Sequence, residues 1–184
     1  MSLWLSLQAR IATLLRQLAE DLRGATAVEF ALLALPFFSL VMLSLQTTTI
    51  FFFNEALQTV ALQSARQIVT GQAQKAGMTQ AQFHSTVCAN APSVFTCGNI
   101  MVDVQSSGSF GSVSTTPLTI TYNGAGAPTN TWAYSPGNPR DIVIMRVMYD
   151  WPLLGGPLSL GLANQSNGSH LMVATTVFKV EPYQ

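Results

Sequence analysis

The chain has 184 residues, with 8 Lys+Arg and 8 Asp+Glu, and 48% of its residues are apolar while only 9% are charged. A soluble globular domain carries about 25% charged residues, so this composition argues against a freely soluble cytosolic protein. The zero net charge also provides no basic surface, and nucleic acid is therefore not expected as a partner.

The first segment, residues 4–22, places apolar side chains at helical spacing, with most of its charged residues elsewhere on the helical wheel. This pattern predicts a short amphipathic helix at the membrane surface. Arg10, Arg16 and Arg23 precede the apolar run that follows, and the next arginine is Arg66. The positive-inside rule then places the N-terminus in the cytoplasm.

The apolar run, residues 30–53, contains no charged residue and no histidine. As a helix it would extend roughly 36 Å at about 1.5 Å per residue, more than the roughly 30 Å of a bilayer's hydrocarbon core. We expect a transmembrane helix, bent at Pro36. A cleaved secretory signal is the alternative, but its apolar region is shorter and ends at a small-x-small site that this run lacks.

The helical spacing continues beyond the membrane. Apolar and small residues recur at three- and four-residue steps, with no Pro or Gly, until Gly71. This pattern predicts one continuous helix over 25–70, with Gly71 as its stop. A second helix is predicted over 79–87, where Thr79 can serve as the N-cap.

Cys88 and Cys97 are the only cysteines, and the loop between them has a turn-forming composition. In an exported domain they are expected to form a disulfide worth roughly 2 to 3 kcal/mol, the alternative being two unpaired buried thiols. No metal site is expected, because neither His84 nor His170 belongs to a Cys-x-x-Cys or His-x-x-x-His group.

The remaining chain alternates short β-rich runs with clusters of Gly, Ser, Thr, Asn and Pro. Its connections are too short for crossover helices, so the strands are expected to be antiparallel and to pack on the C-terminal half of the long helix. Residues 106–116 and 123–140 are expected to be exposed loops. The predicted strands span residues 100–105, 117–122, 141–151 and 170–180.

Residues 24–30, Gly-Ala-Thr-Ala-Val-Glu-Phe, precede the apolar run and resemble the prepilin peptidase site of type IV pilin-like proteins. The match extends through ATAVEFALLALPFF and NEALQTVALQSARQIVTGQAQ to YDWPLL and VFKVEP, which look like TadE/TadG-type proteins of tight adherence (Flp) pilus systems. Phe30 stands where the major Flp pilin usually has Tyr, and this chain is far longer than that pilin. These departures favour a minor pseudopilin.

The resemblance implies cleavage after Gly24, so that Ala25 becomes the mature N-terminus and Glu29 the fifth mature residue. It implies a pilin-like α+β fold with a leader over 1–24, a transmembrane helix over 25–53 and an exported domain over 54–184. The location implied is the bacterial inner membrane, with the C-terminal domain in the periplasm.

The partners implied are the prepilin peptidase, other pilins or pseudopilins, Tad inner-membrane assembly components and the lipid bilayer. Glu29, with Phe30 beside it, is expected to contact a neighbouring subunit by pairing with its new α-amino group, whose pKa is about 7.7 to 8. The alternative is that Glu29 sits among lipid headgroups near the helix N-terminus, where negative charge is favoured.

The sequence also raises two other classes of function. A membrane-anchored envelope binding protein is the alternative reading, supported by long polar loops and by Trp132, Tyr134, Tyr149 and Trp151, although such aromatic residues more often form core and rim. An anchored hydrolase is not expected, because the sequence has no Gly-x-Ser-x-Gly, His-Glu-x-x-His or phosphate-loop motif. We therefore expect no enzymatic activity and no cofactor.

Overall fold

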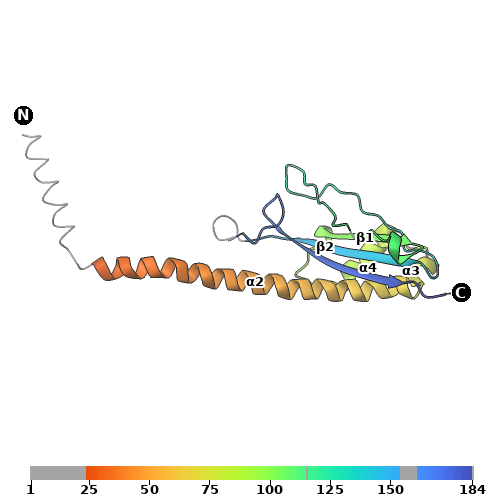
Figure 1. Cartoon of the computed structure of the whole chain (residues 1–184), viewed down its shortest axis with the longest axis horizontal. Helices are drawn as coiled ribbons and strands as arrows, with labels where there is room; N and C mark the ends of the chain where they lie inside the picture. The colour runs from red at the N-terminus through yellow and green to blue at the C-terminus, as the bar shows by residue number, and fades with distance from the viewer. Residues whose placement is uncertain (1–23, 115, 154–160, 184) are drawn as a thin grey trace, which may run out of the picture. The chain divides into compact units, whose positions relative to one another are not determined.

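The computed structural model describes residues 24–114, 116–153 and 161–183, which fall into two compact units, Met1–Met42 and Leu43–Gln184. The predicted amphipathic helix over 4–22 lies outside the described residues. The fold is α+β, as predicted (Figure 1). Its elements in chain order are α2 Ala25–Val69, α3 Gln72–Lys75, α4 Gln80–Asn90, η2 Cys97–Asn99, β1 Ile100–Ser107, η3 Phe110–Ser112, β2 Ile142–Trp151 and β3 His170–Lys179.

The long helix α2 is continuous through Pro36 and ends one residue before the predicted limit. Gly71 stops it, because its backbone adopts the left-handed φ of 72° that glycine tolerates best. The C-terminal segment also caps the last turn of α2, because the backbone amide of Glu181 donates a hydrogen bond to the carbonyl of Val69 at 2.9 Å. The helix end is therefore held by the C-terminal segment as well as by the glycine.

The second predicted helix is present as α4. Thr79 caps it as expected, and the cap is reciprocal: the Thr79 side chain accepts from the backbone amide of Gln82, while the Gln82 side chain accepts from the Thr79 amide. The helix runs three residues further than the sequence predicted, to Asn90, and so includes Cys88.

Three of the four predicted strands form one antiparallel sheet in the order β1-β2-β3. The prediction of a strand over 117–122 was wrong, because this stretch makes only an isolated bridge between Tyr122 and Pro128. Its residues fit an extended backbone, but the neighbouring edge of β1 is taken by a later segment. There the Val104 amide donates to the Ala133 carbonyl, and the Ser135 amide to the Val104 carbonyl.

The sheet packs on the C-terminal half of α2, as predicted, with α4 completing the helical side (Figure 1). Alternate residues of each strand face these helices, so one face of the sheet is apolar. The core joins them to residues of α2 and α4 that recur every three or four positions. Its fully buried members include Leu57, Val60, Ala61, Ile68, Phe83, Val87, Val104, Val143, Met145, Val147 and Ala174.

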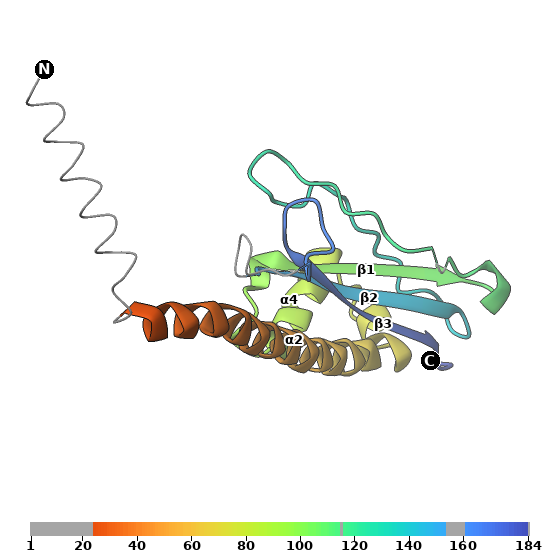
Figure 2. The ribbon, with the colours of Figure 1, turned by 60° about the vertical axis from the view of Figure 1, so that its left-hand side comes forward.

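The opposite face of the sheet is covered by the connection between β1 and β2. Figure 2 shows this irregular segment passing over the sheet on the side away from α2. A smaller apolar cluster forms there from Met101, Ile120 and Met148, with Trp132 packed against it. The loop predicted as exposed over residues 123–140 therefore contributes Trp132 to a third layer, which covers the second face of the sheet.

Candidate functional site

The N-terminal end of α2 holds the predicted processing and assembly residues. Gly24 directly precedes the helix and Ala25 begins it. Glu29 is exposed, and Phe30 retains 70% of its side-chain accessibility. The structure thus places these four residues together at one helix end, with Glu29 one turn from the predicted cleavage point.

Most large apolar side chains of α2 between Val28 and Phe52 are exposed in the part of the chain that the structure describes. The chain has one described helix long and apolar enough to cross a membrane, Thr26–Val69, and its most apolar window is uncovered. Such an uncovered surface is unfavourable in water and suited to a bilayer. The large exposed side chains include Val28, Phe30, Leu32, Leu33, Leu35, Phe37, Phe38, Leu40, Leu45, Phe51 and Phe52.

Three hydroxyl groups within this apolar stretch donate hydrogen bonds to the backbone of the helix itself. Ser39, Thr48 and Thr49 each donate to the backbone carbonyl four residues earlier, at 2.8 Å. This bond lets a hydroxyl enter an apolar environment without losing a hydrogen-bond partner. These three hydroxyl groups are therefore compatible with a membrane environment.

The exposed stretch ends near the predicted membrane boundary at residue 53. Phe53 is half-buried, stacking on Trp151 at 4.5 Å between ring centroids and meeting Phe95 edge-on at 5.8 Å. Leu57, one turn later, is fully buried. Ile50, inside the predicted span, is already buried, and α2 contributes to the main apolar core from Leu57 onward.

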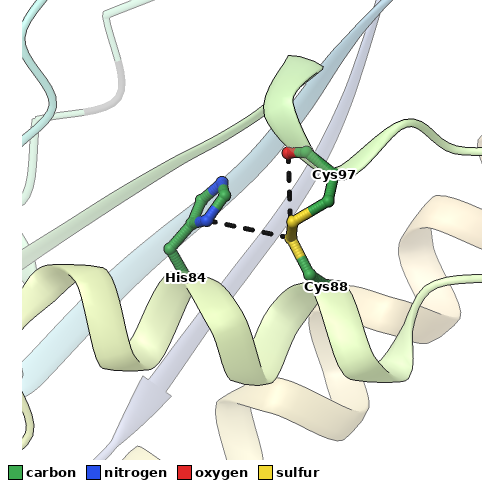
Figure 3. Close-up of side chains that lie close together, drawn as sticks. All are labelled: His84, Cys88 and Cys97. Atoms are coloured by element: carbon green, nitrogen blue, oxygen red, sulfur yellow. Dashed lines mark hydrogen bonds between the residues drawn. A yellow bond between two sulfur atoms is a disulfide. The ribbon is translucent and has the colours of Figure 1, made fainter.

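The predicted disulfide between Cys88 and Cys97 is present, and the alternative of unpaired thiols was wrong. It joins α4 to the start of η2, with the two Cα atoms 5.4 Å apart. Figure 3 shows His84 one turn before Cys88, with its ring beside the sulfurs. Its Nε2 lies 2.8 Å from the carbonyl oxygen of Ile100, and its Nδ1 lies 3.7 Å from the Cys88 sulfur.

The sequence-based expectation, which considered only Cys-x-x-Cys and His-x-x-x-His groups, did not include the proximity of His84 to the two cysteine sulfurs. His84, Cys88 and Cys97 place three potential metal-ligating atoms within 4.8 Å of one another. The signal was the four-residue spacing of His84 and Cys88, which puts both on one face of a helix. The pattern His-x-x-x-Cys combines the two residue types, so it matches neither the Cys-x-x-Cys nor the His-x-x-x-His motif.

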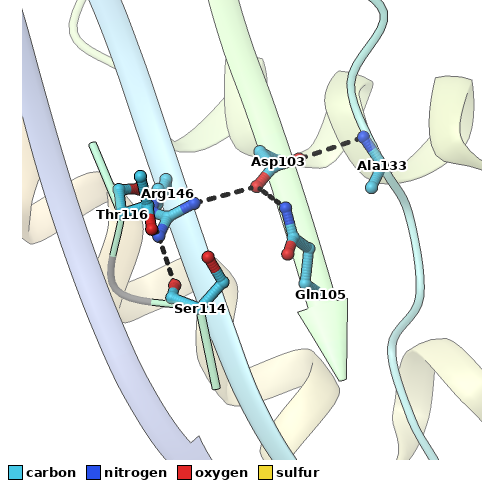
Figure 4. A network of polar contacts seen from close by, with 6 residues as sticks. All are labelled: Asp103, Gln105, Ser114, Thr116, Ala133 and Arg146. Atoms are coloured by element: carbon cyan, nitrogen blue, oxygen red, sulfur yellow. Dashed lines mark hydrogen bonds and ion pairs between the residues drawn. The ribbon is translucent and has the colours of Figure 1, made fainter. Parts of the chain in front are cut away.

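A buried ion pair, which the sequence analysis did not predict, binds the connection between β1 and β2 to the sheet. Asp103 and Arg146 are direct cross-strand partners of β1 and β2, with a carboxylate oxygen 3.5 Å from the guanidinium Nη1. The other guanidinium nitrogen donates to the carbonyls of Ser114 and Thr116, at 2.6 and 3.3 Å. Figure 4 shows Asp103 also accepting from the Ala133 amide.

The four aromatic residues considered as a ligand surface serve mainly as core and rim. Tyr149 is buried against Phe95, Tyr134 packs on Phe83, and Trp132 and Trp151 are half-buried beside the two apolar clusters. Burial raises the pKa of Tyr134. The alternative of an exposed stacking platform therefore gains no support from their positions.

Tyr122 belongs to a second polar cluster, beside Asp150 near the C-terminal end of β2. Its hydroxyl donates to a carboxylate oxygen of Asp150 at 3.0 Å, and Ser169 donates to the same oxygen at 3.1 Å. Burial, and then the neighbouring Asp150 carboxylate, raise the pKa of the Tyr122 phenol. The phenol is thereby kept neutral as a hydrogen-bond donor.

Comparison with protein families identifies the N-terminal region. Residues 24–66 match the family model described as TadE-like protein. This segment is TadE-like. The match begins at Gly24 and extends along α2 into the part that packs against the sheet, and it confirms the predicted resemblance for these residues. The stretches YDWPLL and VFKVEP, for which the resemblance was also predicted, lie outside the match. Searches of curated proteins and of solved structures gave no match.

Proposed function

We propose that this TadE-like chain is a minor pseudopilin that acts in assembly of a Tad (Flp) type IV pilus. The observation that carries the proposal is the family match at 24–66 lying on a helix whose N-terminal half presents uncovered apolar side chains. Such a helix can hold the chain in a bilayer and can later pack against the helices of neighbouring subunits. The role is structural, contributes to pilus formation and surface adhesion, and needs neither a cofactor nor catalysis.

Gly24 is the proposed recognition residue for the prepilin peptidase. A Cβ added at Gly24 would meet no atom of the described residues within 4 Å. Packing within the described part of the chain therefore does not require glycine at this position, which supports a role in recognition by another protein. Cleavage of the Gly24–Ala25 bond would create an α-amino group with a pKa of about 7.7 to 8.

Glu29 is the proposed assembly residue. It is the only charged residue between Gly24 and Glu55, and no ion pair to it is present among the described residues. A carboxylate at a membrane boundary is costly unless it is solvated or paired. The ammonium at Ala25 of a neighbouring subunit would supply the partner, while Phe30 would add apolar contact between the helices.

The proposed location is the bacterial inner membrane, with the N-terminus in the cytoplasm and the C-terminal domain in the periplasm. The three arginines before the span support this orientation. The Cys88–Cys97 disulfide supports an oxidising compartment for the sheet domain. Other pilins or pseudopilins and the Tad inner-membrane assembly components are the proposed protein partners.

The assembly role is tested with Glu29→Gln, which keeps the shape of the side chain and removes its charge. The matched control is Glu55→Gln, because Glu55 is an exposed carboxylate on the same helix. Each variant is expressed in a deletion strain, and membrane insertion, cleavage and piliation are measured. We expect both to insert and to be cleaved, and only Glu29→Gln to impair piliation.

Full restoration of piliation by a cleaved Glu29→Gln protein would mean that Glu29 faces lipid headgroups, and the proposed pairing would be wrong. Normal piliation of the deletion strain itself would instead favour the alternative function, a membrane-anchored envelope binding protein. Because cleavage is measured in the same cells, a processing defect is distinguished from an assembly defect.

A further inference from the structure

Three metal-ligating side chains meet at the end of α4, on the exported side of the proposed membrane helix. One ring nitrogen of His84 and the sulfurs of Cys88 and Cys97 lie within 4.8 Å of one another, with the two sulfurs joined in the disulfide. Figure 3 shows the imidazole and both sulfurs facing the same space between α4 and η2. Two thiolates and one imidazole form a ligand set that suits Zn²⁺.

The orientation of the His84 ring leaves the required nitrogen available. The carbonyl oxygen of Ile100 can only accept, so Nε2, at 2.8 Å from it, carries the proton of the neutral ring. Nδ1 then has a free lone pair, and it faces the Cys88 sulfur at 3.7 Å. Metal-binding histidines are commonly oriented in this way, by donating their other ring N–H to a backbone carbonyl.

We propose that reduction of the disulfide converts His84, Cys88 and Cys97 into a Zn²⁺ site with its fourth position open to solvent. A dithiol supplies two electrons and two protons to the S–S bond, which breaks to give two thiols while the dithiol becomes a disulfide. Zn²⁺ then binds both sulfurs and displaces their two protons, and Nδ1 of His84 supplies the third ligand. The metal-bound and disulfide forms exclude each other.

The surroundings provide an entry path and room for a water ligand. Cys97 is exposed, while Cys88 and His84 are half-buried. A cavity of about 900 Å³ is lined by His84, and by Gly98 and Asn99 directly after Cys97. An ion can therefore reach His84 from the cavity and Cys97 from solvent, while neither cysteine lines the cavity itself. The site shares no residue with the proposed processing and assembly residues Gly24 and Glu29, and it does not depend on the pilus proposal.

The test uses the full chain in detergent micelles, as the oxidised protein and after reduction with a dithiol that is removed under anaerobic conditions. Each form is titrated with Co²⁺, and Zn²⁺ is then added. We expect the reduced protein alone to bind one equivalent of Co²⁺, with thiolate-to-cobalt charge-transfer absorption that Zn²⁺ abolishes. Thiol counting establishes that both cysteines were reduced, and circular dichroism establishes that the domain remains folded.

His84→Gln tests the third ligand and is expected to weaken Zn²⁺ binding by at least about tenfold, as measured by competition with a chelator. The matched control is His170→Gln, because the other histidine is also half-buried and also contacts a backbone carbonyl, that of Leu162. We expect its Zn²⁺ affinity to equal that of the wild type.

Three results would overturn the proposal. The first is failure of the reduced wild-type protein to bind Co²⁺ or Zn²⁺, including failure because it unfolds and Zn²⁺ does not restore it. The second is equal binding by the oxidised and reduced forms, which would assign the metal to other groups. The third is an unchanged affinity in folded His84→Gln.

Discussion

Replacing Arg146 with Met removes one partner of the buried ion pair while keeping most of the side-chain volume. Both charged side chains are nearly inaccessible, with relative exposures of 6% for Arg146 and 4% for Asp103. Breaking a buried pair from one side typically costs about 3 to 5 kcal/mol, because the other charge remains uncompensated. We expect the free energy of unfolding to fall by about 3 kcal/mol, since Asp103 keeps its hydrogen bonds from Gln105 and Ala133.

Such a loss is a large share of a total stability of about 5 to 15 kcal/mol, and it should lower the melting temperature by roughly 6 to 12 °C for a chain of this size. The free energy of unfolding is measured by urea titration of the full chain in micelles, with near-ultraviolet circular dichroism as the signal. Arg66→Met is the control, because Arg66 is exposed on α2. We expect its stability to stay within about 0.5 kcal/mol of wild type.

The double variant Asp103→Leu, Arg146→Met distinguishes the free energy lost with the ion pair from the free-energy cost of leaving one charge buried without its partner. We expect it to lose at least about 1 kcal/mol less than the sum of the two single variants, since no unpaired charge remains. A loss below about 1 kcal/mol in Arg146→Met, as at an exposed pair, would refute the reasoning. So would strict additivity of the two substitutions.

Gly71→Ala is expected to destabilise the protein by at least about 1 kcal/mol more than Gly77→Ala, because both glycines have positive φ but only a Cβ at Gly71 would overlap the ring of Tyr183. Equal losses in urea unfolding would show that the Tyr183 ring moves aside freely. Tyr122→Phe is expected to cost about 0.5 to 1.5 kcal/mol at neutral pH through the lost hydrogen bond to Asp150. Since burial raises the pKa of the folded phenol above 10, the unfolded state releases its proton first, and the wild type loses stability as pH rises above 10. The stability difference between wild type and Tyr122→Phe should therefore shrink there, and a constant or growing difference would contradict the assignment.

The helices could be predicted closely because their signals are local. Apolar spacing and Gly71 defined α2 to within one residue at its end, and Thr79 with Gln82 defined the start of α4. Strand alternation predicted three strands and also the apolar face of the sheet. These patterns involve residues only two to four positions apart, so they can be recognised directly in the sequence.

The missed features depend on long-range pairing. Residues 117–122 have strand-like composition, but no local signal shows that residues 133–135 occupy the edge of β1 instead. Asp103 and Arg146 meet only through the register of β1 against β2. The approach of Cys97 to His84 likewise required the loop to close. The sequence correctly predicted the two disulfide partners, but not the imidazole beside their sulfurs. The roles of the residues around Gly24 stay predictions.

The central claim is that this chain, whose residues 24–66 match the TadE-like family model, enters a pilus machine as a processed pseudopilin. It is tested most directly by the mature N-terminus of the protein. Intact-mass and N-terminal peptide measurements compare the protein from cells with and without their prepilin peptidase. The account predicts a chain that begins at Ala25 when the peptidase is present and a chain that retains the segment before Ala25 when it is absent. Detection of only chains that retain Met1 or Ser2 in pilus-competent cells would contradict it and would identify a permanently anchored protein.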